Sequence, residues 1–176
     1  MANRQTAICL MLLLSAGCAS HQKGAAATRP TGRATPHDIN ELGKQFTDAL
    51  AAGDTNAAAK LFISHAEWNQ VIDGTDLAYI ERQDRMLGVL DRLREFVRNA
   101  KFVTAASMPR ESEWLEPGSQ LSNGLRLKTR VEVKRNVRLW INVRDDVRQL
   151  EMGTLLNIDG AWRYIDEPKL RRRDFF

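Results

Sequence analysis

A histidine, a glutamate and a tryptophan lie close together in the sequence, and such residues can carry out acid–base chemistry. His65 precedes Glu67 by two positions and Trp68 by three. Histidine changes its charge near neutral pH, and a carboxylate beside it can orient it for proton transfer. The same stretch, beginning at Ser64, also fits a capping box at a helix start, with Trp68 in the core. The spacing thus predicts either a catalytic His65–Glu67 pair or a helix N-terminus.

Other reactive groups are sparse. Asp73 and Asp76 flank a Gly-Thr pair, but a calcium loop needs more oxygen ligands at regular spacing, so a turn and a helix cap are expected there. Outside the expected helix start at 35–38, His65 is the one histidine of the globular part, and no free cysteine accompanies it, so the usual zinc ligand set is missing. We therefore expect no metal ion and no cofactor.

The chain begins with a pattern that is typical of a targeting segment. Arg4 supplies a positive charge, and residues 7–14 are apolar but fewer than the roughly 20 that span a bilayer. Small residues then lead to Cys18. The stretch LLLSAGCAS, residues 12–20, resembles the lipobox of bacterial lipoproteins, in which the cysteine sulfur carries a diacylglyceryl group and the chain is cut just before it. An ordinary secretory peptide, releasing a soluble periplasmic domain, is the alternative.

The lipoprotein resemblance implies an address in the cell envelope. Residues 1–17 would be removed as a signal peptide, and lipid on Cys18 would hold the chain in the membrane. Ala19 stands where an aspartate would retain the protein in the inner membrane, so the resemblance implies the periplasmic face of the outer membrane. Cys9 lies in the removed segment and Cys18 is lipidated, so we expect no disulfide.

Composition divides the rest of the chain into three parts. Residues 18–35 have almost no large apolar side chains and are predicted to be a flexible tether. Residues 36–168 form the globular domain, and residues 169–176 a basic tail. The formal net charge is +4, yet no basic–aromatic nucleic-acid motif is found, and an address outside the cytoplasm argues against nucleic acid as a partner.

Apolar residues at helical spacing occupy the first half of the domain. Thr35 and Pro36 fit the start of a helix that Gly53 ends, and Asp54 fits the cap of a second one over residues 55–62. A short helix follows Ser64. A long amphipathic helix is expected over about residues 76–100. Its predicted apolar stripe consists of Ile80, Met86, Leu87, Leu90, Leu93 and Val97.

Alternating apolar residues in the second half predict strands. A strand over 102–108, a loop or hairpin over 110–124, and one bent strand over 125–143 are expected, although two strands joined by a turn at Arg135-Asn136 fit the last stretch too. Asp145-Asp146 and Asp159-Gly160 predict turns around a strand ending at Ile158, and the latter favours a type I′ hairpin. Helices grouped before antiparallel strands predict an α+β fold, with one long helix packed on a curved sheet of four to six strands.

Two stretches resemble the nuclear-transport-factor-2-like superfamily, the SnoaL-like, cystatin-like cone. They are FTDALAAGDTNAAAKLF, residues 46–62, and LLNIDGAWRYID, residues 155–166. With the order of elements between them, the likeness covers about residues 38–166. It implies a pocket between helices and sheet, which family members use as enzymes or as binding scaffolds. No catalytic motif of the isomerases or cyclases can be carried over to this chain.

Cationic and aromatic residues are the remaining candidates for binding. In the predicted strand over 125–143, polar even-numbered residues alternate with apolar odd-numbered ones. Several arginines and one tryptophan would therefore share a solvent-exposed face. We expect a lipid-anchored, non-enzymatic domain that binds a protein, an envelope component or a small apolar ligand. The alternative is an isomerase- or cyclase-type enzyme that uses the cone pocket. The candidate binding residues are Trp68, Tyr79, Arg126, Arg130, Arg138 and Trp140.

Overall fold

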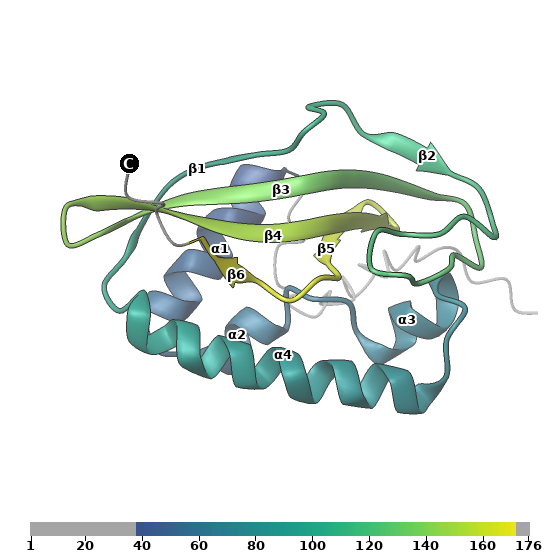
Figure 1. The fold of residues 1–176 in the computed structure, drawn as a ribbon, viewed down its shortest axis with the longest axis horizontal. Helices are drawn as coiled ribbons and strands as arrows, with labels where there is room; N and C mark the ends of the chain where they lie inside the picture. The colour runs from purple at the N-terminus through teal and green to yellow at the C-terminus, as the bar shows by residue number, and fades with distance from the viewer. Residues whose placement is uncertain (1–37, 172–176) are drawn as a thin grey trace, which may run out of the picture. The chain divides into compact units, whose positions relative to one another are not determined.

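The computed structural model describes residues 38–171, and in this range four helices come before six strands (Figure 1). Cys18, the tether and residues 172–176 lie outside the described range. The predicted α+β class is therefore confirmed, with one long helix and a six-stranded antiparallel sheet. The elements are α1 (Ile39–Ala51), α2 (Thr55–Ala59), α3 (His65–Val71), α4 (Asp76–Phe96), β1 (Lys101–Ala106), β2 (Glu113–Leu115), β3 (Val131–Val143), β4 (Asp146–Ile158), β5 (Ala161–Tyr164) and β6 (Lys169–Leu170).

Short polar side chains start three of the helices. Asp54 accepts a hydrogen bond from the backbone N–H of Ala57 at 2.7 Å, and Thr75 caps α4 in the same way. Ser64 and Glu67 form the capping box that the sequence predicted for α3. These bonds satisfy N–H groups that have no partner within the helix. The N-cap of α1 is Asp38 and not Thr35, which lies outside the described residues.

Several element boundaries differ from the sequence prediction, including those of the first strand, which covers Lys101–Ala106 instead of 102–108. The second helix stops at Ala59 rather than Phe62, because Phe62 instead forms a bridge with Tyr164 of β5. The long helix stops at Phe96, earlier than the predicted residue 100. A short strand, β2, lies within 110–124 and pairs with β3.

The central strand β3 pairs with β1 and β2 on one side and with β4 on the other. Its register shifts between Lys134 and Val137, and Asn136 has a positive φ of 49°, so the single bent strand is confirmed across Arg135-Asn136. The strand begins at Val131, however, and not at Leu125. Before it, Arg126 and Leu127 form isolated bridges to Gln120 and Ile72.

The bulge divides the buried residues of β3 between two clusters. Val133 belongs to the cluster around α3, whereas Val137 belongs to the one around α1 and α4. On β4 the neighbours Leu155 and Leu156 also belong to different clusters, and neighbouring strand residues point to opposite faces. Both sheet faces are therefore buried at this end. The predicted burial of the odd-numbered residues of β3 is confirmed, but the prediction that they share a single face is wrong.

The two hairpin turns of β3–β4–β5 use left-handed backbone. Asp159 and Gly160 have φ values of 51° and 83°, which confirms the predicted turn of the type I′ class. The earlier turn is centred on Arg144 and Asp145, with φ values of 50° and 64°. It lies one residue before the predicted Asp145-Asp146 turn, because Val143 pairs directly with Asp146.

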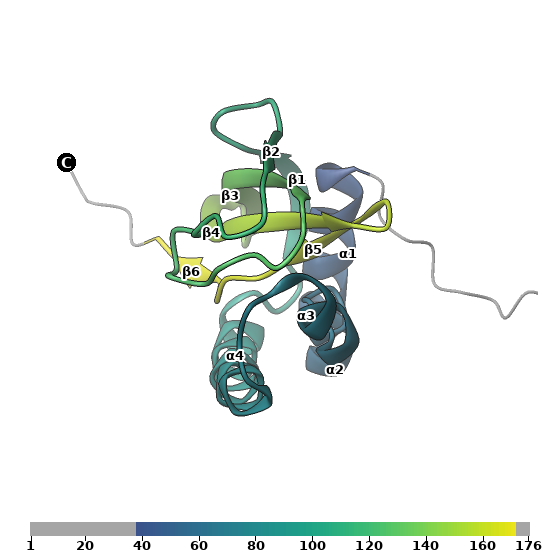
Figure 2. The ribbon, with the colours of Figure 1, turned by 90° about the vertical axis from the view of Figure 1, so that its right-hand side faces the viewer.

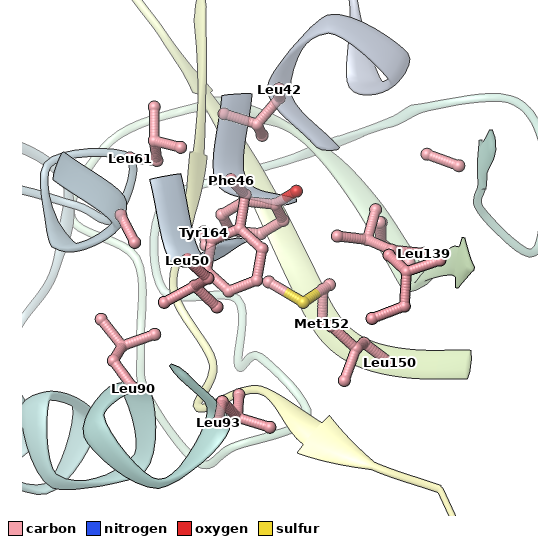
Figure 3. Packing of buried hydrophobic residues seen from close by; sticks show 14 of the residues in the cluster. Leu42, Phe46, Leu50, Leu61, Leu90, Leu93, Leu139, Leu150, Met152 and Tyr164 are labelled. Carbon is pink, nitrogen blue, oxygen red and sulfur yellow. The ribbon is translucent and has the colours of Figure 1, made fainter. Parts of the chain in front are cut away.

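The larger apolar cluster lies between the helices and the sheet (Figure 3). Helices α2 and α4 lie on the side of the sheet away from the β1–β2 loop (Figures 1 and 2). Of the predicted stripe, Ile80 and Leu87 are wrong as core residues, being 52% and 37% exposed. The residues labelled in Figure 3 are Leu42, Phe46, Leu50, Leu61, Leu90, Leu93, Leu139, Leu150, Met152 and Tyr164.

Candidate functional site

The predicted His65–Glu67 pair is not formed. Nε2 of His65 lies 2.8 Å from Oδ1 of Asp76, and its ring stacks on Tyr79 with centroids 4.8 Å apart. Glu67 accepts hydrogen bonds from the backbone N–H of Ser64 and from Nε of Arg163, both at 2.8 Å. Glu67 therefore closes the helix cap and holds β5, while His65 joins the starts of α3 and α4.

The histidine affects the acidity of Asp76. Its hydrogen bond and its charge lower the pKa of this carboxyl below the ordinary value of 3.8. The ionised carboxylate beside His65 therefore stabilises the fold above pH 3.8, and this contribution is lost as the pH falls through the lowered pKa. Both side chains are at least half exposed, so solvent weakens the pair.

We expect Asp76→Asn to destabilise the protein at about pH 5 and to matter less in stronger acid. Urea unfolding should show a difference from the wild type at about pH 5 that shrinks as the pH falls below 3.8. Asp84→Asn, an exposed substitution on the same helix, is the control and should give a smaller difference at about pH 5. An Asp76→Asn effect that stayed constant with pH would contradict the assignment.

Two of the predicted aromatic site residues belong to the interior. Trp68 is fully buried in the cluster around α3, and its Nε1 has no hydrogen-bond partner. Tyr79 is half-buried between Trp68 and His65, with its ring centroid 5.7 Å from that of Trp68. Burial raises the pKa of the Tyr79 hydroxyl. Trp68 is thus a packing residue, and Tyr79 connects it to the exposed histidine.

Little room is left between the helices and the sheet at the place where the family resemblance implies a pocket. The space beside Phe62, Tyr79, Met86 and Tyr164 amounts to about 10 Å³, roughly enough for one water molecule. Tyr164 is fully buried, and burial raises the pKa of its hydroxyl, which has no hydrogen-bond partner. Apolar packing therefore fills this region.

A partly buried carboxylate at the end of β5 holds α4 to the sheet. Oδ1 of Asp166 accepts hydrogen bonds from Arg82 at 3.1 Å and from Asn123 at 2.6 Å, and Oδ2 accepts one from the backbone N–H of Thr154 at 2.7 Å. Arg82 also donates from Nε to the carbonyl of Ile165 at 2.8 Å. Burial lowers the pKa of the Arg82 guanidinium, and the charge of Asp166 opposes that shift.

This network, which we call the Asp166 clamp, consists of Arg82, Asn123, Thr154, Ile165 and Asp166. It borders an open polar cleft of about 380 Å³. Because both carboxylate oxygens already have partners within the protein, the clamp fits a structural role better than acid–base chemistry. Sequence reasoning missed it, since no local pattern links Arg82 to a residue 84 positions away.

The predicted cationic residues do not share one face. Arg130 lies over the ring of Trp114, 4.8 Å from its centroid, and its Nε is 3.1 Å from a carboxylate oxygen of Glu116. Arg138 and Trp140 lie further along β3, paired with Glu151 and Gln149 of β4. Arg126 is in a loop, bridged to Gln120.

Trp114 is an exposed aromatic residue that the sequence analysis missed. It is 57% exposed, whereas Trp140, the predicted one, is half-buried. The signal was present, because Trp114 stands in the polar stretch ESEWLEPGS, residues 111–119, which offers few apolar neighbours.

Among residues 38–171, no three histidine, cysteine, aspartate or glutamate side chains gather in a way that could hold a metal ion. Within the same range, no helix combines the length and the apolar composition that a membrane span requires. Searches of protein-family models, of curated proteins and of solved structures found no match to the chain.

Proposed function

We propose that this protein is a lipoprotein anchored at the periplasmic face of the outer membrane, whose domain binds a protein of the cell envelope without catalysis. The anchor is proposed on the stretch LLLSAGCAS and its Cys18. Two or more acyl chains on one cysteine suffice for stable attachment, since each buried methylene contributes about 0.8 kcal/mol. The tether would allow the domain to reach partners near the membrane.

The binding surface is proposed around β2, and the exposure of Trp114 is the observation that carries it. We call Trp114, Glu116 and Arg130 the β2 surface. Tryptophan and arginine are the residue types most enriched where protein interfaces derive their affinity. Leaving a tryptophan ring in water is unfavourable, and a partner would cover it. The loop that carries β2 projects from the sheet on the side away from α4 (Figures 1 and 2).

The alternative, an isomerase- or cyclase-type enzyme using the cone pocket, is less well supported. Such a site needs a concave pocket of about 300 Å³ or more, with convergent polar groups. The space beneath the sheet is about 10 Å³. The larger cleft beside the Asp166 clamp is open, and the carboxylate of Asp166 is already bonded within the protein.

The anchor is tested by replacing each cysteine in the full chain, expressed in a diderm bacterium that is fed labelled palmitate. Cys18→Ser should abolish the label and prevent processing, whereas Cys9→Ser should leave both unchanged, because Cys9 belongs to the removed segment. A mature Cys9→Ser chain that begins at Cys18 without added lipid mass would contradict the anchor while leaving the binding proposal open.

The β2 surface is tested by placing a photo-crosslinking residue at position 114 in living cells. A discrete adduct with one envelope protein is expected, and Arg130→Ala should weaken it. The matched control carries the crosslinker at Leu77, an exposed apolar residue of α4. The same adducts from both positions, or none from position 114, would contradict the proposal.

A further inference from the structure

Three cations surround one hollow at an end of the domain, and none of them has a carboxylate partner among residues 38–171. Arg98 follows α4, Lys101 begins β1, and Arg144 lies in the turn between β3 and β4. Together they line a hollow of about 250 Å³, whose remaining lining residues are Asn99, Asn142 and Asp145. Two chain segments that are distant in sequence, 98–101 and 142–145, therefore bring these charges to one place.

Nearby cations behave differently, which makes the three unusual. Arg94 is 3.2 Å from a carboxylate oxygen of Glu95, and Arg148 is 2.6 Å from one of Asp146. Among the described residues, no ion pair is formed by Arg98, Lys101 or Arg144. Acids are available at this end of the domain, yet these three positive charges are not neutralised by them.

The backbone at Arg144 gives a second, independent indication. Its φ is 50°, and asparagine or glycine is preferred at that position of a type I′ turn. An arginine there is strained relative to a glycine, because its Cβ approaches the following carbonyl oxygen. Turn formation does not explain the choice of residue, and strained backbone is often found where a side chain has a function.

Ordinary structural roles explain only part of the cluster. Arg98 comes two residues after the end of α4, where a cation interacts favourably with the helix dipole. Lys101 and Arg144 have no such role. Exposed cations are commonly solvated, but solvation does not require the segments 98–101 and 142–145 to place three cations around one hollow.

We propose that Arg98, Lys101 and Arg144 form a binding site for a phosphate group. Guanidinium groups match phosphate oxygens with paired hydrogen bonds, and the lysine adds a compact charge. The two asparagine amides supply further donors. Asp145 leaves the hollow with a net charge of about +2, and its carboxylate can accept a hydrogen bond from a hydroxyl of a phosphate ester.

This site is distinct from the β2 surface and does not rest on the lipid at Cys18. The β3–β4 turn and β2 lie at opposite ends of the sheet (Figure 1).

The phosphate could belong to a soluble ester or to a phospholipid headgroup, and the experiment separates these sources. A chain of residues 33–176 suits it, because every described helix and strand and both apolar clusters lie within that range.

Binding of inorganic phosphate and of glycerol 3-phosphate is measured by calorimetry, and binding to vesicles by co-sedimentation. The vesicles contain phosphatidylcholine with or without phosphatidylglycerol. Arg144→Asn and Lys101→Gln should each weaken binding about tenfold, as expected for loss of one charge-assisted hydrogen bond. Arg144→Asn should leave the fold equally or more stable, because asparagine suits the turn. Weaker binding therefore cannot be attributed to unfolding.

Arg92→Gln is the matched control, because it removes the same charge from an exposed position of α4 outside the hollow. It should leave phosphate affinity unchanged. Binding of the soluble probes identifies a soluble ester site, and binding of phosphatidylglycerol vesicles alone identifies a headgroup site. No binding of any probe, or an equal loss in Arg92→Gln, would overturn the proposal.

Discussion

Replacing Gly153 by alanine is expected to lower the free energy of unfolding by about 3–5 kcal/mol. Gly153 has a φ of 73°, and a Cβ added there would lie 2.3 Å from Oδ2 of Asp166 and 2.6 Å from its Cβ. The new methyl group would push Asp166 away from the N–H of Thr154 and from Arg82, and so disrupt the Asp166 clamp. Breaking a partly buried ion pair leaves Arg82 without its counter-charge.

The control for this substitution is Gly160→Ala. Gly160 has a similar φ of 83°, but nothing lies within 4 Å of its added Cβ. Gly160→Ala should therefore lower the free energy of unfolding only by the cost of a side chain at positive φ, about 1 kcal/mol. Urea unfolding gives the loss of unfolding free energy for each variant. The difference between the two losses measures the effect of the close contact between the new Cβ and Asp166. Equal losses in the two variants would show that the clamp contributes nothing to stability.

Features of the fold with a local cause could be predicted from the sequence. The capping box at Ser64 and the turn at Asp159-Gly160 were correct, because each depends on residues a few positions apart. The order of helices and strands followed in the same way from the change in hydrophobic period. Boundaries were less accurate wherever a distant partner decided them, as when Phe62 left the helix to bridge Tyr164.

The buried positions of β3 were predicted correctly, but the face that each of them occupies could not be predicted, for the same reason. Odd-numbered residues of β3 are buried on both sides of the bulge, but by different parts of the chain. An alternating pattern reveals that a face is covered and does not identify what covers it. Only the position of α3 against Val133 and Leu156 determines that the second face is also dry.

Prediction of the site was limited for the same reason, because its residues contact partners that are distant in the sequence. His65 and Glu67 are neighbours in sequence, yet their partners are Asp76 and Arg163. The groups that converge in space, such as Arg98 and Arg144, lie far apart in sequence. Spacing arguments find sites built on one helix or loop, and this domain assembles its charged clusters from several elements.

Replacing Trp68 by alanine is expected to lower the free energy of unfolding by about 3–5 kcal/mol, the usual range for a fully buried aromatic residue. Trp68 is 0% exposed and packs in the cluster with Val71, Ile72 and Leu127. It also lies against Gly74, where an added Cβ would be 2.9 Å from Cζ2 of the indole ring. The indole ring is therefore tightly packed, and alanine would leave a cavity in its place.

The matched substitution Trp114→Ala separates packing from binding. Trp114 is 57% exposed and contacts the Arg130 guanidinium, so its loss should cost less than about 1 kcal/mol. The free energies of unfolding of the two variants, measured by heat or urea, should thus differ by several kcal/mol. Arg130 loses its aromatic partner only in Trp114→Ala. If Trp114→Ala proved as destabilising as Trp68→Ala, Trp114 would be a structural residue, and the β2 surface would lose the observation on which it depends.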